Sequence, residues 1–437
     1  MSQPVVNSVP ASFSDTSRAL IDEDIRQQVS FSSAEAAGYS EPLLVMSEQR
    51  LRNNVRRFMQ AMPRVRPHYA VKANSNPAIL EIFRQEGTCF EIASSAELDA
   101  LLALGVPAEE VFYSNPIKSP TAVKYAAAKG VRWYSVDSTE ELEKIAAIAP
   151  QAKLYIRIEV SNEGSSWPLA GKFGASRTGI AAIIATALQY QLNLCGVTFH
   201  VGSQCCNTEN WVEGIKSAKA IFEKLTGNGF TPQLLNLGGG YKVARMESEV
   251  GTDLQECGAP VAEMFREFAQ ATGREIRLEI EPGTYLLANT CAVLSTVQDV
   301  VSTGADGYDF LKLDTGMTEI LRPSIYGAQH PIYILQPEAA TETRAYVIAG
   351  HCCESGDILT PAPGDPELLA TRALPLCQIG DLCVIDGAGA YCAAMSTKHY
   401  NSYPEAAEIM LDAAKVPHLI RRRQKLADIW ANEVALD

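Results

Sequence analysis

The stretch 68–92 reads HYAVKANSNPAILEIFRQEGTCFEI and contains the first unit of the pattern that decides the fold. A short run, His68–Val71, is followed by a segment with helical spacing of apolar residues, Pro77–Arg84, and by a second short run, Cys89–Ile92. Strand-length runs that alternate with helix-length segments are typical of βαβ units, in which helices join parallel strands.

The same alternation continues to about residue 281. Six further strand-like runs are Val111–Tyr113, Arg132–Val136, Leu154–Ile158, Gly196–His200, Leu234–Leu237 and Arg277–Glu281. Helix-like segments between the runs include Ala96–Leu104, Thr121–Ala128, Thr139–Ala149 and Trp211–Lys224. Eight alternations predict an α/β fold with a closed (β/α)₈ barrel of the TIM type, and an open doubly wound sheet is the alternative.

After about residue 285 the helical segments become rare and Pro and Gly turns separate short runs. The strand-like runs are Ala292–Val301, Phe310–Leu313, Ile332–Leu335, Ala345–Ala349, Leu382–Ile385 and Glu408–Leu411. We therefore expect a barrel domain over 45–285 and a mostly β domain over 286–437. Residues 1–44 are too few for a core of their own, and we expect them to pack with the β domain.

Composition excludes several classes of protein. The chain of 437 residues carries a formal net charge of −14, which repels nucleic acid. Its first residues lack a basic start with an apolar core, and no apolar run reaches membrane-spanning length, so we expect a cytoplasmic protein without a membrane partner. Eleven cysteines without C-x-x-C spacing favour reduced thiols over a disulfide framework or a zinc knuckle.

Several residues with chemical potential stand where the strands stop: Lys72, Arg157, His200, Gly238 and Glu281. The active sites of such barrels lie at the C-terminal strand ends, so we expect these residues to converge on one rim. A lysine there is placed to form an imine, although an ordinary solvated lysine fits the same motif. Glu281 could hold a proton on the nitrogen of a pyridine ring, or it could be a solvated turn residue.

A strand runs into three glycines at Leu234-Leu-Asn-Leu-Gly238-Gly-Gly-Tyr241. Amides without side chains can approach a phosphate closely, although a glycine run is also a common tight turn. The spacing is not the G-x-G-x-x-G of dinucleotide sites, so the phosphate of a smaller cofactor is favoured. His200 could stack on a planar ring and Ser203 could bind the phosphate, and no spacing of the six histidines supports a metal site.

Seven motifs, taken in order, resemble the pyridoxal-phosphate-dependent decarboxylases of fold type III, the group that contains ornithine, arginine and diaminopimelate decarboxylases. They are YAVKAN at 69–74, FEIASSAEL at 90–98, FHVGSQ at 199–204, LNLGGGY at 235–241, EPG at 281–283, CESGD at 353–357 and GAGAY at 387–391. The resemblance covers about residues 42–425, and the segments 322–331, 353–357 and 419–424 are most similar to diaminopimelate decarboxylase.

The resemblance implies a role for each matched residue. Lys72 would hold pyridoxal phosphate covalently, while His200 stacks on its ring and Glu281 pairs with the ring nitrogen. The expected cofactor-binding set is completed by Arg157, Ser203, Gly238, Gly239, Gly240, Gly283 and Tyr391. Cys353 would donate a proton to the product carbanion, and Cys353 and Glu354 would reach into the neighbouring subunit of an obligate homodimer.

Substrate choice is where the sequence departs from the family. The family usually reads Glu-Pro-Gly-Arg, but residue 284 is threonine, which replaces neither the charge nor the bidentate geometry of arginine. Arg322, Tyr326 and Glu354 match substrate contacts and are retained. We expect decarboxylation of a diamino acid or a related conjugate with altered recognition of the distal group. The alternatives are a true meso-diaminopimelate decarboxylase that makes L-lysine, a lysine or ornithine decarboxylase, and a non-catalytic regulatory homologue.

Overall fold

The computed structural model describes residues 42–434 except 170, 246–248, 250, 274–275, 305–306 and 336–341. The described residues fall into two compact units. The barrel unit is formed by Arg52–Val243 and Gly251–Leu286, and the β unit by the described residues of 42–51, 244–250 and 287–434. Most of the expected N-terminal segment 1–44 lies outside the described residues.

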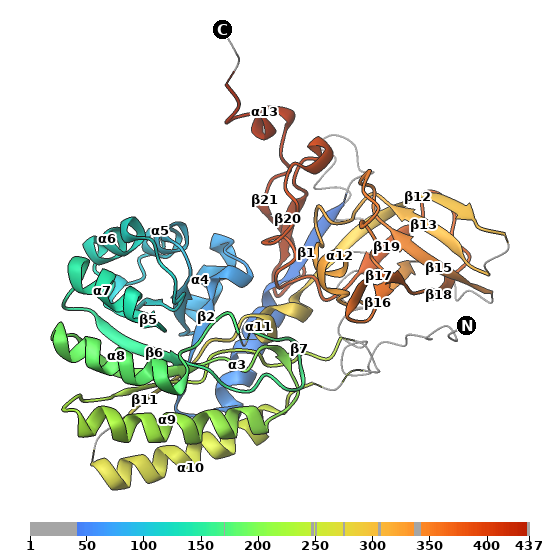
Figure 1. Ribbon diagram of the computed structural model, residues 1–437. Helices are drawn as coiled ribbons and strands as arrows, with labels where there is room; N and C mark the ends of the chain where they lie inside the picture. Colours follow the sequence, from blue (N-terminus) through green and yellow to red (C-terminus); the bar gives the residue numbers. More distant parts are fainter. Residues whose placement is uncertain are drawn as a thin grey trace. The chain divides into compact units, whose positions relative to one another are not determined.

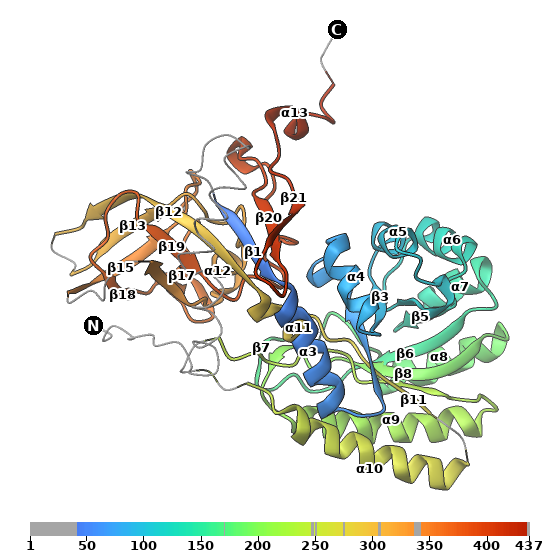
Figure 2. The same ribbon diagram turned by 180° about the vertical axis from the view of Figure 1, so that it is seen from behind.

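Eight strands of the described barrel unit close into an all-parallel barrel (Figures 1 and 2). In order around the barrel they are β10 (Leu234–Asn236), β11 (Arg277–Ile280), β2 (Val65–Ala70), β3 (Cys89–Ile92), β4 (Phe112–Tyr113), β5 (Trp133–Val136), β6 (Lys153–Ile158) and β8 (Asn193–Phe199). Each corresponds to one of the eight runs read from the sequence, so the predicted closed barrel is confirmed and the open sheet is wrong. A small hairpin pairs β7 (Ser165–Trp167) with β9 (Ser203–Cys205).

Helices cover the outside of these strands in both views (Figures 1 and 2). They are α4 (Pro77–Gln85), α5 (Ser95–Ala103), α6 (Pro120–Lys129), α7 (Thr139–Ile148), α8 (Arg177–Gln189), α9 (Glu209–Gly227) and α10 (Leu254–Thr272), with the 3₁₀ turns η1 (Val71–Ala73) and η2 (Ala108–Glu110). Helices α3 (Glu48–Ala61) and α11 (Thr284–Leu287) flank the barrel sequence. Helices α8 and α10 are not among the segments named from the sequence, and α10 contains Pro260, a residue that disfavours helix interiors.

Local signals explain where several helices begin. The side chain of Asn76 accepts the amide of Ala78 at 3.0 Å, and Pro77 occupies the first position of α4, where its missing N–H costs nothing. Ser119 accepts the amide of Ala122 at the start of α6, and Gly130 with φ of 101° caps the C-terminal end of this helix. Such caps satisfy amides and carbonyls that have no partner inside the helix.

Large aromatic side chains fill the barrel. Phe112, Trp133 and Tyr155 are buried together with Cys195 and Leu234, and the rings of Phe112 and Trp133 stack with centroids 4.8 Å apart. The barrel is therefore a packed core rather than a pore, and only its rim offers space for chemistry.

A buried ion pair joins two neighbouring barrel strands that are far apart in the sequence. His68 on β2 lies 3.0 Å from the carboxylate of Glu279 on β11, and neither side chain is exposed. Arg277 also pairs with Glu279. Burial by itself lowers the pKa of His68, but the carboxylate of Glu279 and the neighbouring thiol of Cys89 raise it to about 9. His68 is therefore protonated at neutral pH.

The β unit is built on a sheet of nine strands within its described residues (Figures 1 and 2). The main path runs β18 (Arg372–Pro375), β15 (Thr343–Ala349), β13 (Asp309–Leu313), β12 (Cys291–Ser302), β1 (Leu43–Ser47), β20 (Ala407–Leu411) and β21 (Pro417–Arg421), while β19 (Leu382–Ile385) joins β12 to β14 (Ile332–Leu335). The predicted mostly β character of the C-terminal part is confirmed.

Smaller elements complete this unit. They are the hairpin of β16 (Pro361–Ala362) and β17 (Asp365–Leu369), helices α12 (Arg322–Tyr326) and α13 (Leu426–Ile429), and the turns η3 (Ala288–Thr290) and η4 (Tyr400–Ser402). Strand β1 lies between β12 and β20, antiparallel to the first and parallel to the second. Its buried residues Leu43 and Val45 belong to a cluster with Ala292, Val384 and Ile409.

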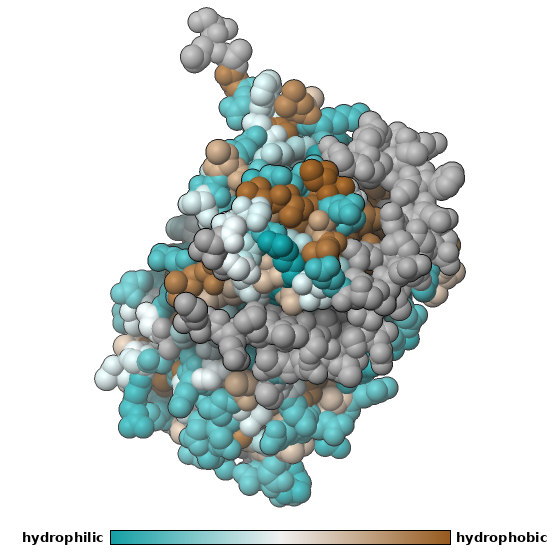
Figure 3. Space-filling model, turned by 90° about the vertical axis from the view of Figure 1, so that its right-hand side faces the viewer, coloured by the Kyte–Doolittle hydropathy of each residue, from teal (hydrophilic) through white to brown (hydrophobic). Residues whose placement is uncertain are grey.

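The described residues on one face of the molecule are mainly polar. Teal hydrophilic residues predominate on the face drawn in Figure 3, with brown apolar residues gathered in a few patches. No helix among the described residues has both the length and the apolar character needed to cross a membrane.

Candidate active site

Polar side chains gather at the C-terminal ends of the barrel strands, as the sequence predicts. Lys72 lies in η1 directly after β2, His200 follows β8 and Glu281 follows β11. Arg157 stands near the end of β6, and the glycine run begins two residues after β10. Parallel strands of a barrel end on the same rim, so these residues from distant parts of the chain share one site.

Lys72 is paired with a carboxylate that the sequence analysis gave no role. Its Nζ donates to Oε1 of Glu91 at 2.8 Å, and the lysine side chain is 45% exposed while that of Glu91 is 1% exposed. Burial raises the pKa of Glu91 to about 7, against the opposing effect of Lys72 and with a further contribution from Glu281. The signal was present in the sequence as a single acidic residue inside the buried strand Cys-Phe-Glu-Ile.

Glu281 is held by two neutral donors, one directly after β4 and one on β10. Its Oε1 accepts the hydroxyl of Ser114 at 2.6 Å and the Nδ2 amide of Asn236 at 2.7 Å. The Oδ1 of Asn236 in turn accepts the backbone N–H of Gly238 at 2.8 Å. One amide side chain therefore fixes both the carboxylate and the start of the glycine turn. Neither Ser114 nor Asn236 was identified from the sequence.

The glycine turn has no room for side chains. A Cβ on Gly238 would lie 2.0 Å from the carbonyl oxygen of Phe199, and one on Gly240 would lie 2.2 Å from that of Gly202. A Cβ on Gly239 would lie 2.5 Å from the carbonyl oxygen of Glu281. Gly238 and Gly240 also adopt positive φ values of 64° and 103°. Close backbone packing and left-handed conformations thus both require glycine here.

The other expected barrel residues lie beside this turn or on the segment after Glu281. Ser203 is partly buried and directly follows Gly202 at the start of β9. Gly283 is buried, and its carbonyl accepts the amide of Leu286 at 3.2 Å. The guanidinium carbon of Arg157 lies 4.8 Å from the ring centroid of Phe173. Burial lowers the pKa of Arg157, while the charge of Glu281 raises it.

His200 is held in its neutral form. Its Nδ1 accepts the backbone N–H of Gly202 at 3.0 Å, which leaves the proton on Nε2. Burial and the positive charges of Arg157 and Lys72 lower the pKa of His200 well below its usual value. The rim therefore presents a neutral flat ring, which suits stacking better than an imidazolium would.

The β unit brings three expected residues together. The guanidinium of Arg322 lies 5.1 Å from the ring centroid of Tyr326 and 5.4 Å from that of Tyr391. Arg322 is 8% exposed, and burial lowers its pKa. Nη1 of Arg322 also donates to Sδ of Met395 at 3.8 Å. A guanidinium over aromatic rings is held in position, and its planar N–H groups match the geometry of a carboxylate or phosphate.

Cys353 and Glu354 occupy an exposed turn of the β unit. The backbone N–H of Cys353 donates to Oδ1 of Asn401 at 2.8 Å, and the hydroxyl of Tyr400 donates to Glu354 at 3.0 Å. This hydroxyl holds the pKa of Glu354 below its usual range. Behind the turn, the buried carboxylate of Asp357 accepts the amide of Cys352 at 2.9 Å. These hydrogen bonds fix the conformation of the turn, although Cys353 and Glu354 are exposed.

The barrel rim fits one type of cofactor. A half-exposed lysine amine suits an aldehyde, a fixed carboxylate suits the nitrogen of a pyridine ring, and a glycine turn without room for a Cβ suits a phosphate. Pyridoxal phosphate carries all three groups. The fold and this arrangement define a pyridoxal-phosphate enzyme on a (β/α)₈ barrel.

Comparison with known proteins gives the family. Residues 48–288 match the model of the pyridoxal-dependent decarboxylase pyridoxal binding domain. The chain belongs to this family, and it is a pyridoxal-phosphate-dependent amino-acid decarboxylase. The predictions of family, cofactor and enzyme class are confirmed.

Two sequence relatives and one structure illustrate the similarity. Diaminopimelate decarboxylase of Neisseria meningitidis is 30% identical over 92% of this chain and 96% of its own. Ornithine decarboxylase of Mus musculus is 30% identical over 87% of this chain and 82% of its own. The structure of diaminopimelate decarboxylase from M. jannaschii in complex with L-lysine aligns with a TM-score of 0.81 at 25% identity, covering 93% of this chain and 94% of that one.

Proposed function

We propose that this enzyme removes the α-carboxylate of a diamino acid, or of a related amino-acid conjugate, with recognition of the distal group that differs from its relatives. The observation that carries the reaction is the pairing of Lys72 with Glu91 beside a carboxylate, Glu281, that two donors hold in place. Bound pyridoxal phosphate supplies the electron sink that accepts the electron pair left when CO₂ departs.

Glu91 controls the proton on Lys72. An ammonium is not a nucleophile, so Nζ of Lys72 must lose a proton before it can attack a carbonyl. The carboxylate of Glu91 is 2.8 Å away, and its pKa of about 7 lets it take up and return that proton near neutral pH. Glu91 is the acid and base partner of the lysine amine.

Glu281 sets the charge of the cofactor ring. Its carboxylate, oriented by Ser114 and Asn236, would face the ring nitrogen and keep it protonated. Neutral His200 would cover the ring face without adding a competing positive charge. Racemases of related fold usually set an arginine at the ring nitrogen, so a carboxylate favours decarboxylation over racemisation.

The phosphate would be held mainly by backbone amides. Gly238, Gly239 and Gly240 can approach it because they carry no Cβ, and Ser203 adds a hydroxyl. Gly283, Arg157 and Tyr391 are the remaining proposed cofactor contacts.

Substrate recognition rests on a different set of residues. Arg322 with Tyr326 would hold a carboxylate of the substrate, and Glu354 would hold a distal ammonium. Relatives are named for diaminopimelate and ornithine, and one solved relative binds L-lysine. Thr284 lacks the charge expected for a distal carboxylate contact, which favours a substrate other than meso-diaminopimelate.

Cys353 and Glu354 belong, in our proposal, to the active site of a partner subunit in a homodimer. Cys353 would deliver a proton to the product carbanion as a neutral thiol.

All eleven cysteines lie within the described residues and are free, which supports a reducing compartment such as the cytoplasm.

The reaction and substrate are tested by CO₂ release from the purified protein with pyridoxal phosphate. Meso-diaminopimelate and both enantiomers of lysine and of ornithine are compared, and Lys72→Ala is the control without the reactive amine. Preference for diaminopimelate would refute altered distal recognition. Turnover of lysine or ornithine alone would support it, and no release from all five would direct the search to conjugated amino acids.

The shared site is tested by mixing two inactive variants, Lys72→Ala and Cys353→Ala. If each site combines one barrel unit with the β unit of the partner, random re-pairing restores roughly a quarter of the sites. No recovery after subunit exchange, verified by mixing differently tagged chains, would refute the shared site.

A further inference from the structure

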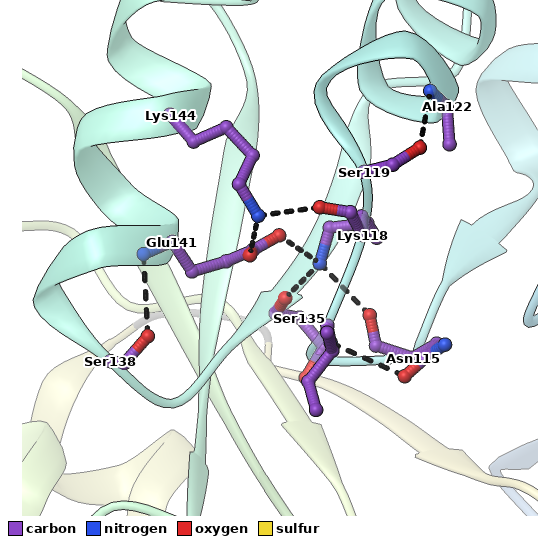
Figure 4. A network of polar contacts seen from close by, with 9 residues as sticks. Asn115, Lys118, Ser119, Ala122, Ser135, Ser138, Glu141 and Lys144 are labelled. Carbon is purple, nitrogen blue, oxygen red and sulfur yellow. Dashed lines mark hydrogen bonds and ion pairs between the residues drawn. The ribbon is translucent and has the colours of Figure 1, made fainter.

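A fully buried lysine stands next to the active-site rim without belonging to it. Lys118 follows β4, and its side chain has no exposed surface. Its Nζ donates to the carbonyl of Ser135 at 2.7 Å and to that of Asn115 at 2.9 Å, and it lies 3.0 Å from the carboxylate of Glu141 (Figure 4). One ammonium thus joins the β4 loop to β5 and to α7.

This arrangement is costly, and the surroundings are built to tolerate it. Removing an ammonium from water disfavours its charged form, and burial lowers the pKa of Lys118 to about 8 despite the charge of Glu141. Lys144 pairs with the same carboxylate of Glu141 (Figure 4). Replacing a buried ion pair by hydrophobic side chains of similar volume is often neutral or stabilising, so stability alone does not explain the polar bonds of Lys118.

The bonds of Lys118 fix the segment that carries Ser114. Strand β4 is only two residues long, Phe112–Tyr113, and Ser114 is the next residue. The amide of Ser114 donates to Ile92 on β3 at 3.2 Å, and the carbonyl of Asn115 accepts from Lys118. Ser114 is therefore held by the sheet on its N-terminal side and by Lys118 through the residue that follows it.

Ser114 is the hydroxyl that reaches Glu281. Its Oγ lies 2.6 Å from Oε1 of Glu281 and 2.9 Å from the hydroxyl of Tyr155. Ser114 lies one residue beyond a strand of only two residues, and loop segments are more mobile than the strands they follow, so anchoring the following loop helps to keep this geometry.

We propose that Lys118 is a positioning residue of the decarboxylase, which fixes the Ser114–Asn115 segment so that the hydroxyl of Ser114 stays bonded to Glu281. The inference rests on the proposed role of Glu281 toward the cofactor ring. Lys118 touches neither cofactor nor substrate, and it acts through Ser114.

A double-mutant cycle tests this route of action. Lys118→Met, Ser114→Ala and their combination are compared for kcat/KM, and for the Kd of pyridoxal phosphate measured by quenching of protein fluorescence. Loss of a hydrogen bond to a charged group changes an equilibrium or rate constant by about 10-fold to 100-fold. Lys118→Met weakens such a bond indirectly and should lower kcat/KM by about tenfold. In the Ser114→Ala background the same substitution should change kcat/KM and Kd by less than about twofold.

Lys144→Met is the matched control. It removes the other cation from Glu141 and the bond from Lys144 to the backbone carbonyl of Lys118, but it leaves the bonds of Lys118 to Asn115 and Ser135 intact. Because those two bonds fix the Ser114–Asn115 segment, kcat/KM should stay within about twofold of the original. Equal losses from Lys118→Met with and without the Ser114 hydroxyl would overturn the proposal and make Lys118 a purely structural residue.

Two further measurements keep the outcome unambiguous. Folding of Lys118→Met is checked by urea unfolding of the cofactor-free chain. If this variant does not fold, the double variant Lys118→Met with Glu141→Leu, which removes both buried charges, replaces it in the cycle. Glu281→Gln separates the two levels of inference. An unaffected Glu281→Gln enzyme would refute the role of Glu281, whereas a damaged one with an additive cycle would refute only the role of Lys118.

Discussion

The Asn236→Asp substitution tests the site most directly, because it changes charge while almost preserving shape. Asn236 donates to Glu281 at 2.7 Å and accepts from Gly238 at 2.8 Å. The introduced carboxyl can still accept from Gly238, but its other oxygen would face the oxygen of Glu281. Only the chemistry of the contact with Glu281 therefore changes.

The energies of charge repulsion and of hydrogen bonding decide whether the two carboxyl groups keep a proton. Two ionised carboxylates 2.7 Å apart repel by roughly 6 kcal/mol at an effective dielectric constant of about 20. A hydrogen bond to a charged group contributes only about 1.5–3 kcal/mol, so repulsion wins and the pair retains one shared proton. While that proton is bound, the introduced group donates to Glu281 as the amide did.

The Asn236→Asp enzyme should therefore be active at low pH and lose activity as pH rises and the shared proton leaves. Its kcat/KM at the alkaline end should fall about 10-fold to 100-fold below the original enzyme, which has no such pair. The assay is CO₂ release from pH 5 to 9, with Asn236→Ala as the control that cannot share a proton. Identical pH profiles for Asn236→Asp and the original enzyme would refute the reasoning.

Three further predictions concern stability, cofactor binding and specificity. The pKa of His68 is raised from 6.5 to about 9, so its stabilisation is present below pH 6.5 and is lost as pH rises through 9. The free energy of unfolding, measured with urea, should decline with rising pH by up to about 3 kcal/mol less in the His68→Gln protein than in the original. An unchanged dependence of this free energy on pH would contradict the prediction. Gly238→Ala should weaken pyridoxal phosphate binding at least about tenfold by fluorescence titration, whereas Gly229→Ala, which meets no atom within 4 Å, should leave binding unchanged. Thr284→Arg should raise CO₂ release from diaminopimelate relative to lysine by about one to two orders of magnitude, and an unchanged ratio would assign residue 284 to the phosphate.

The sequence determined the fold because barrel strands and helices have local signals. Each run from His68–Val71 to Arg277–Glu281 matches an observed strand within a few residues. It also placed Lys72, Glu281 and the glycine turn on the rim, since position at a strand end is a property of the sequence pattern. Helices α8 and α10 were not among the segments named, although α10 alone of the two contains a proline, Pro260.

Tertiary structure alone decided which partners these residues have. Glu91 meets Lys72 because β3 pairs with β2, and Ser114 and Asn236 meet on Glu281 because the barrel closes through β10, β11 and β2. These contacts depend on the register between strands that are distant in the sequence, and a register shift of one residue would turn each side chain to the opposite face. The sequence by itself therefore determined which reactive residue types stand at the rim. Closure of the barrel determined their hydrogen bonds and shifted their pKa values.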